Sequence, residues 1–133
     1  RYSKIGSKDK IPAGHVLIID SIGLLSRLYK LADIAYVGGA FKSGLHNILE
    51  PATFRIPLIF GPKYTSFPEA VALVKRNAAR SISSASELAR AVEEFRMPER
   101  RIKAKADISA YLQEQKGATE RIMKHLEQEA FIT

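Results

Sequence analysis

The fold class follows from one segment, Tyr36-Val-Gly-Gly-Ala-Phe-Lys-Ser-Gly-Leu-His-Asn-Ile-Leu-Glu-Pro-Ala52. It begins at the end of an apolar run, passes through three glycines, and continues into a pattern typical of a helix start. Glycine permits positive φ and lets a ligand approach the backbone closely. A strand, a glycine-rich loop and a helix in this order predict one unit of an α/β fold.

Apolar runs without polar alternation lie on both sides of this segment. Such runs are typical of strands that are covered on both faces of a parallel sheet. We expect strands at 16–19, 34–37, 57–60 and 80–83, and helices at about 24–33, 47–55, 66–78, 84–95, 99–115 and 118–130. Strands that alternate with helices predict a Rossmann-like parallel sheet of about four strands with flanking helices.

Polar residues mark where several of these helices start. Ser66 and Ser84 are each followed three residues later by Glu, which predicts two capping boxes. Asp20 follows the first expected strand, and we expect it to cap the helix after Gly23 or, as an alternative, to orient the loop.

Length and composition set the limits of the domain organisation. The 133 residues, with 46% hydrophobic side chains, are enough for one real core. We divide the chain into a partial Rossmann-like domain, 1–95, and a helical extension, 96–133, that packs on the same domain. Tyr111, Leu112, Ile122, Met123, Leu126 and Phe131 have helical spacing and are expected in the core.

Several classes of function are excluded by what the sequence lacks. No apolar run approaches the roughly 20 residues of a membrane-spanning helix. The chain has no cysteine, and His15, His46 and His125 are too far apart for ligand spacing, so no metal site is expected. The chain starts at Arg1, without an initiator Met, from which we expect a fragment of a longer protein.

The glycine-rich loop is the candidate binding site. Ligands of parallel α/β sheets bind beyond the carboxyl ends of the strands. The helix after the loop offers backbone N–H groups and a positive dipole end to a phosphate, with Asn47 as its cap. Glu50, in the first turn, can accept hydrogen bonds from two ribose hydroxyls at once.

Structural roles remain open for the same residues. The glycines can serve a tight turn, and Glu50 matches a capping box with Asn47. His46 can be bonded to a neighbouring carbonyl, and Lys42 can be either a phosphate contact or a solvated lysine.

The segment also carries a resemblance that extends to its surroundings. The matching motifs are Asp20-Ser-Ile-Gly23, Leu28-Tyr29, Ala32-Asp-Ile-Ala-Tyr-Val-Gly-Gly39, Gly44-Leu-His-Asn47, Leu49-Glu-Pro-Ala52, Pro57-Leu-Ile-Phe-Gly-Pro62 and Phe67. In order and spacing they resemble the family of bacterial 3-deoxy-D-manno-octulosonic acid (Kdo) transferases over about residues 16–75. Leu24, Leu45 and Lys63 depart from the family pattern, which has Glu, Gly and His there.

The resemblance implies the C-terminal half of a two-domain GT-B glycosyltransferase, inverting and metal-independent. Such an enzyme transfers Kdo from CMP-Kdo, without a cofactor, to a lipid A precursor in lipopolysaccharide biosynthesis. By analogy, Gly39, Ser43, Gly44 and Asn47 lie near the donor phosphate and Glu50 holds the ribose. His46 and Lys63 are supporting candidates, and the catalytic base belongs to the missing N-terminal domain.

The implied partners and place in the cell follow from the same resemblance. We expect the whole protein at the cytoplasmic face of the bacterial inner membrane, near an anionic lipid surface, and the fragment alone to be soluble and inactive. An exposed sheet edge predicts that the fragment self-associates.

Two alternatives remain. One is another GT-B enzyme, a UDP-sugar transferase or epimerase. The other is a basic module for anionic lipid or nucleic acid, suggested by the net charge of +7 and by the basic run Arg96, Arg100, Arg101, Lys103 and Lys105. A solvated helix face also explains that run, and without interleaved aromatic residues we expect no nucleic acid partner.

Overall fold

The architecture is a small parallel sheet with helices packed around it, seen in a computed structural model that describes residues 1–6 and 8–128. The strands β1 (Ala35–Val37), β2 (Leu58–Phe60) and β3 (Ala79–Ser81) lie in the order β1-β2-β3, all parallel. The helices are α1 (Leu25–Tyr29), α2 (Leu49–Thr53), α3 (Pro68–Lys75), α4 (Ala85–Arg96), α5 (Pro98–Glu114) and α6 (Ala118–Gln128). The predicted parallel α/β fold is confirmed.

The central strand carries the core. All three residues of β2 are fully buried, as expected for an apolar run covered on both faces. β1 differs, because Tyr36 is 52% exposed between buried Ala35 and Val37. One face of β1 therefore stays accessible at the carboxyl end of the sheet.

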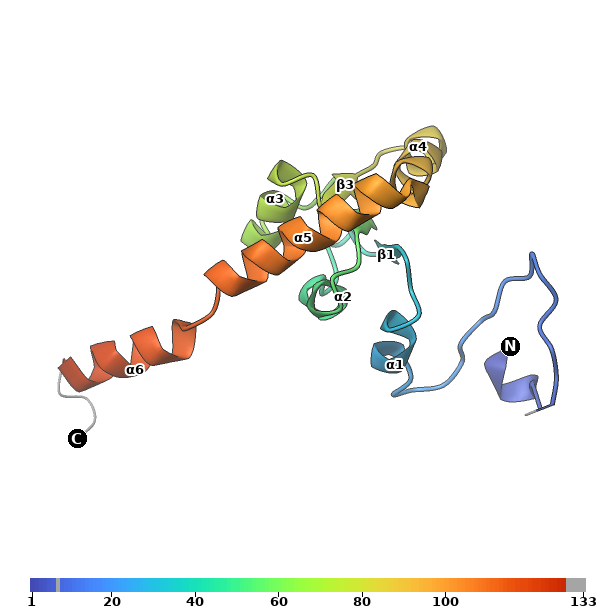
Figure 1. The fold of residues 1–133 in the computed structure, drawn as a ribbon, viewed down its shortest axis with the longest axis horizontal. Coiled ribbons are helices and arrows are strands. Elements are labelled where there is room, and N and C mark those ends of the chain that lie inside the picture. Colours follow the sequence, from blue (N-terminus) through green and yellow to red (C-terminus); the bar gives the residue numbers. More distant parts are fainter. Residues whose placement is uncertain (7, 129–133) are drawn as a thin grey trace.

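The long helix α5 covers the body of the domain. It packs against α3 and α4, and it buries Ala104, Ile108 and Tyr111, which share one face at spacings of four and three residues. Figure 1 shows how α5 crosses the domain while α6 extends from its end, away from the sheet.

The position of α6 makes part of the core prediction wrong. Ile122 and Met123 are 59% and 43% exposed, although Tyr111 and Leu112 contact the core as predicted. An amphipathic pattern states which side chains can be buried, but burial requires a neighbour that packs on that face. Phe131 and the predicted helix end at 130 lie outside the described residues.

The N-terminal segment contains the largest error in the expected sheet. Residues 16–19 form no strand, and Val16 and Ile18 are 89% and 57% exposed. A strand needs an adjacent strand with which to exchange backbone hydrogen bonds, whereas this segment runs away from the sheet (Figure 1). The described sheet therefore has three strands instead of about four.

Helix α1 is also shorter than predicted, and Asp20 does not cap it. The Asp20 carboxylate accepts hydrogen bonds from the Ser3 backbone N–H at 2.9 Å and from the Ser3 hydroxyl at 2.6 Å. These bonds lower the pKa of Asp20. Asp20 thus orients the loop, which was the alternative interpretation.

The two predicted capping boxes have different outcomes. Ser84 caps α4, because its hydroxyl accepts from the Glu87 N–H at 3.2 Å, while the Glu87 carboxylate accepts from the Ser83 N–H at 2.6 Å. Ser66 caps nothing, since α3 begins at Pro68 and Phe67 is its N-cap. Proline forces the residue before it out of the helical region, so the start is shifted past Ser66.

Candidate functional site

The glycine-rich loop after β1 folds back on itself. The Lys42 N–H donates to the Gly39 carbonyl at 3.0 Å, and the His46 N–H donates to the Gly38 carbonyl at 3.2 Å. Gly39 and Gly44 have φ values of +92° and +111°, which side-chain-bearing residues rarely adopt. The loop therefore uses, at these two positions, the positive φ that glycine permits.

Gly39 is required for a second reason, which is space. A Cβ atom there would lie 2.2 Å from the Gly44 carbonyl oxygen and 2.6 Å from Cδ2 of His46. Gly39 therefore lets the two ends of the loop meet, and the His46 imidazole packs over it.

A pocket of about 350 Å³ opens beside this loop, and we call it the Glu50 pocket. It lies where β1, the loop, α1 and α2 meet, at the carboxyl end of the strand. Its lining residues are Leu25, Tyr29, Tyr36, Val37, Gly38, His46, Asn47 and Glu50. The structure thus brings three of the predicted site residues, His46, Asn47 and Glu50, into one pocket.

The start of α2 determines where Glu50 lies. The helix begins at Leu49, later than the predicted start at Asn47, and Asn47 Oδ1 accepts from the Leu49 N–H at 2.9 Å. The N-cap residue is Ile48, so the prediction that Asn47 caps this helix is wrong by one residue, although its side chain accepts from the first helical N–H. Pro51 falls in the first turn, where a missing N–H is tolerated.

Glu50 has no capping role in the described part of the chain. Its half-buried carboxylate lines the pocket and accepts no hydrogen bond from any described residue. Burial raises the pKa of Tyr29, and the Glu50 charge raises it further. The acid is therefore directed to the pocket instead of to its own backbone.

A second pocket, of about 550 Å³, lies at the other end of the loop, and we call it the Lys63 pocket. Its lining residues are Lys42, Ser43, Gly44, Pro62, Lys63, Thr65, Ser66 and Phe67. Lys63 ties its walls together: its N–H donates to the Ala40 carbonyl at 2.9 Å, and its ammonium donates to the Lys42 carbonyl at 3.1 Å.

The residues predicted to surround one phosphate are therefore divided. Ser43 and Gly44 line the Lys63 pocket, Asn47 lines the Glu50 pocket, and Gly39 lies beneath the loop between them. Their roles in binding remain predictions.

Sequence reasoning assigned no binding role to four polar residues that line these pockets, the first of which is Tyr29 at the end of α1. Tyr36 is exposed on β1, and Thr65 and Ser66 follow the Gly61-Pro62 turn at the carboxyl end of β2. The signal for the hydroxyl pair was its position, because such turns are where α/β sheets bind ligands.

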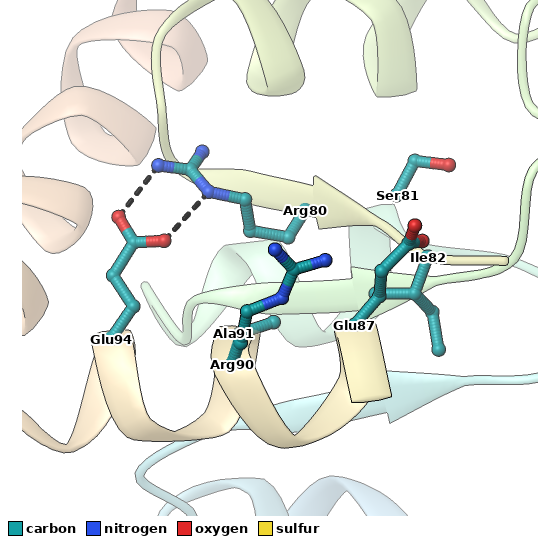
Figure 2. A pocket seen from close by; sticks show the side chains of 7 residues that line it. All are labelled: Arg80, Ser81, Ile82, Glu87, Arg90, Ala91 and Glu94. Atoms are coloured by element: carbon teal, nitrogen blue, oxygen red, sulfur yellow. Dashed lines mark hydrogen bonds and ion pairs between the residues drawn. The ribbon is translucent and has the colours of Figure 1, made fainter. Parts of the chain in front are cut away.

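A third hollow, of about 230 Å³, lies between β3 and α4 (Figure 2). Two of its charged groups pair with each other, because Arg80 donates to both carboxylate oxygens of Glu94, at 2.8 and 2.6 Å. A third, Glu87, accepts from the Ser83 N–H. Arg100 also pairs with Glu94, so this carboxylate joins β3, α4 and α5. The hollow is better explained as a structural joint than as a binding site.

The joint predicts a pH-dependent stability. The hydrogen bonds from Arg80, followed by those from Arg100, hold the pKa of Glu94 below its ordinary value of 4.5. A depressed folded-state pKa stabilises the fold above the unfolded pKa, and this stabilisation is lost as the pH falls through the folded value. We expect Glu94→Gln to lower the free energy of unfolding by about 2 kcal/mol at pH 7. In urea titrations the difference from the parent chain should shrink below pH 4.5; a constant difference would contradict the charge argument.

Four of the five residues in the basic run, which spans the end of α4 and the first part of α5, form ion pairs. Arg96, Arg100, Arg101 and Lys103 pair with Glu93, Glu94, Asp33 and Asp107, respectively. These pairs reduce the positive potential that a nucleic acid or an anionic membrane would meet, so they weaken the argument for a basic binding module.

Within residues 1–6 and 8–128, no group of His, Asp or Glu side chains is arranged to hold a metal ion. In the same residues, none of the helices has both the length and the apolar character needed to cross a membrane.

Comparison with known proteins gives consistent results. No protein-family model matches the chain. It is 54% identical over 56 residues to a Kdo transferase of Chlamydia pneumoniae, covering 41% of this chain and 13% of the relative. It is 35% identical over 113 residues to a Kdo transferase of Haemophilus influenzae, covering 81% of this chain and 26% of the relative. The chain thus spans at most about a quarter of the length of these two relatives.

A solved structure shares the fold. The C-terminal CMP-Kdo binding domain of WaaA from Acinetobacter baumannii matches with a TM-score of 0.63 and 30% identity. The match covers 71% of this chain and 51% of that domain. Together with the sequence matches and the parallel sheet, it shows that this chain is similar in sequence and fold to the C-terminal portion of Kdo transferases, which are glycosyltransferases.

Proposed function

We propose that this chain is the donor-binding part of a glycosyltransferase that transfers Kdo from CMP-Kdo to a lipid A precursor in lipopolysaccharide biosynthesis. The observation that carries the proposal is the Glu50 pocket, with an unengaged carboxylate at the carboxyl end of a parallel strand. In the proposal no metal or other cofactor takes part, and CMP-Kdo is a substrate.

The chemistry of the pocket suits a nucleoside. A carboxylate can accept hydrogen bonds from both ribose hydroxyls, and such charge-assisted bonds are about twice as strong as neutral ones. Tyr36 and Tyr29 provide aromatic surface beside it. The glycine-rich loop brings backbone close to the same pocket, where the phosphate of the nucleotide would follow the ribose.

The remaining partners belong to the proposal as well. The catalytic base would come from the N-terminal half of the enzyme, and the acceptor, a lipid A precursor, would be bound at the cytoplasmic face of the inner membrane. On this proposal the chain binds the donor and does not catalyse transfer alone.

Nucleotide choice tests the proposal. We expect CMP to shift the amide NMR signals of Gly38, His46 and Asn47 at millimolar concentrations, and UMP to do so more weakly, because the donor carries cytosine. Glu50→Gln should reduce the CMP response about tenfold, at the scale of one charge-assisted hydrogen bond. Glu99→Gln, an exposed site on α5, is the matched control.

The same titration separates the alternatives. A stronger response to UMP would favour a UDP-sugar enzyme. CMP shifts that occur away from the Glu50 pocket would reject the site.

A further inference from the structure

The Lys63 pocket differs in chemistry from the Glu50 pocket, although both border one loop. Its charged lining residues are two lysines, Lys42 and Lys63, with no acidic residue among those that line it. The other polar side chains that line it are the hydroxyl groups of Ser43, Thr65 and Ser66. The Glu50 pocket instead carries an acid and aromatic surface.

The backbone adds further donors to the Lys63 pocket. Within the described residues, the N–H groups of Ser43, Gly44, Thr65 and Ser66 donate to no other backbone carbonyl outside a helix or strand. Successive backbone N–H groups with a glycine at positive φ, here Gly44 at +111°, form the type of concavity that binds anions.

Lys63 is held in place while it keeps donors for a ligand. One hydrogen of its ammonium group goes to the Lys42 carbonyl, and an ammonium group has three. Lys42 accepts this hydrogen bond with its backbone oxygen, so its side-chain ammonium group takes no part in it.

We propose that the Lys63 pocket is a sugar subsite, in which Lys42, Lys63 and the adjacent hydroxyls and N–H groups bind the carboxylate of the acidic sugar of the donor. This inference rests on the proposed function and divides the site into two parts. The nucleoside occupies the Glu50 pocket, and the sugar acid occupies the Lys63 pocket at the other end of the loop.

The division predicts that the lysine variants and the Glu50 variant weaken the binding of different probes. Three probes are titrated into the chain: cytidine, CMP and CMP-Kdo. Lys42→Met and Lys63→Met should weaken CMP-Kdo about tenfold relative to CMP, as expected for the loss of one charge-assisted hydrogen bond, and should leave cytidine unchanged. Glu50→Gln should weaken all three probes by the same factor.

Two control variants, and a comparison between the two test variants, keep the test interpretable. Lys75→Met removes an exposed lysine of α3 that does not line the pocket, and should change nothing. Lys63→Arg keeps the positive charge and should retain most of the preference for CMP-Kdo. Lys42→Met leaves the tie between Lys63 and the Lys42 carbonyl intact, so its effect cannot come from loosening the loop.

The outcomes are distinguishable. If both lysine variants weaken CMP and CMP-Kdo equally, the pocket binds the nucleotide phosphate, and the carboxylate subsite is wrong. If neither variant changes the affinity for CMP or for CMP-Kdo, the pocket is not a donor subsite at all, although the proposed function would stand. If the parent chain binds none of the three probes, the proposed function itself fails.

Discussion

Replacing Glu50 by alanine is expected to lower kcat/KM of the enzyme that contains this chain at least about 100-fold. The carboxylate would hold both ribose hydroxyls, and hydrogen bonds to a charged group contribute about 1.5–3 kcal/mol each. Losing both costs roughly 3 kcal/mol or more, and each 1.4 kcal/mol is a factor of ten. The measurement is initial-rate transfer of Kdo from CMP-Kdo, at several donor concentrations.

Stability should be unaffected by the same change. The Glu50 side chain makes no hydrogen bond to the described residues, so replacing it removes no hydrogen bond that holds α2 in place. Thermal unfolding of Glu50→Ala and Glu99→Ala should therefore coincide with that of the parent protein. Unchanged turnover in Glu50→Ala would reject the ribose role, and a large loss of stability would show that the acid is structural.

Replacing Gly39 by alanine is expected to lower the free energy of unfolding by about 3 kcal/mol and to abolish CMP binding. A side chain at φ +92° is strained by about 1–3 kcal/mol. The added methyl group would also lie 2.2 Å from the Gly44 carbonyl oxygen, which is backbone and cannot rotate away. The loop must open to accommodate it, which moves His46 in one pocket and Gly44 in the other. Urea unfolding and CMP titration measure the two effects.

Gly14 offers a matched control for this prediction. Its φ is +80°, but a Cβ there would meet no atom within 4 Å. Gly14→Ala therefore carries the backbone strain without the steric clash, and we expect a loss of about 1–2 kcal/mol, smaller than that of Gly39→Ala, and unchanged CMP binding. Equal losses in Gly14→Ala and Gly39→Ala would show that the close approach inside the loop has no energetic importance.

Both predictions depend on the way in which one loop builds the site. The 38–48 loop connects a buried strand to α2, and its two ends meet over Gly39. Because the two pockets share this loop, a change that opens it affects both, whereas Glu50→Ala and Lys42→Met each affect one.

The positions of β1 and β2 and the cap at Ser84 could be predicted because they depend on residues that are close in the sequence. The run at 57–60 is apolar at every position, which only a strand covered on both faces accommodates. Gly39 and Gly44 have the positive φ that glycine permits. Glu50 was predicted as an available acid from its place one turn into a helix, and it lines a pocket.

The errors have the opposite character, because each depends on a contact that is distant in the sequence. Residues 16–19 have the composition of a strand but no strand beside them, and Ile122 has helical spacing but extends away from the core with α6. Asp20 has a side chain that could cap a helix, but its carboxylate accepts hydrogen bonds from Ser3 instead.

The sequence by itself determined the α/β class, the glycine-rich loop and the identity of its acid, since these follow from backbone preferences and local periodicity. Only the tertiary structure decided that Ser43 and Asn47 lie in different pockets and that Arg96, Arg100, Arg101 and Lys103 are paired with acidic residues. The reason is physical: which side chains share a cavity, or neutralise one another, depends on how the loops after β1 and β2 approach each other in space.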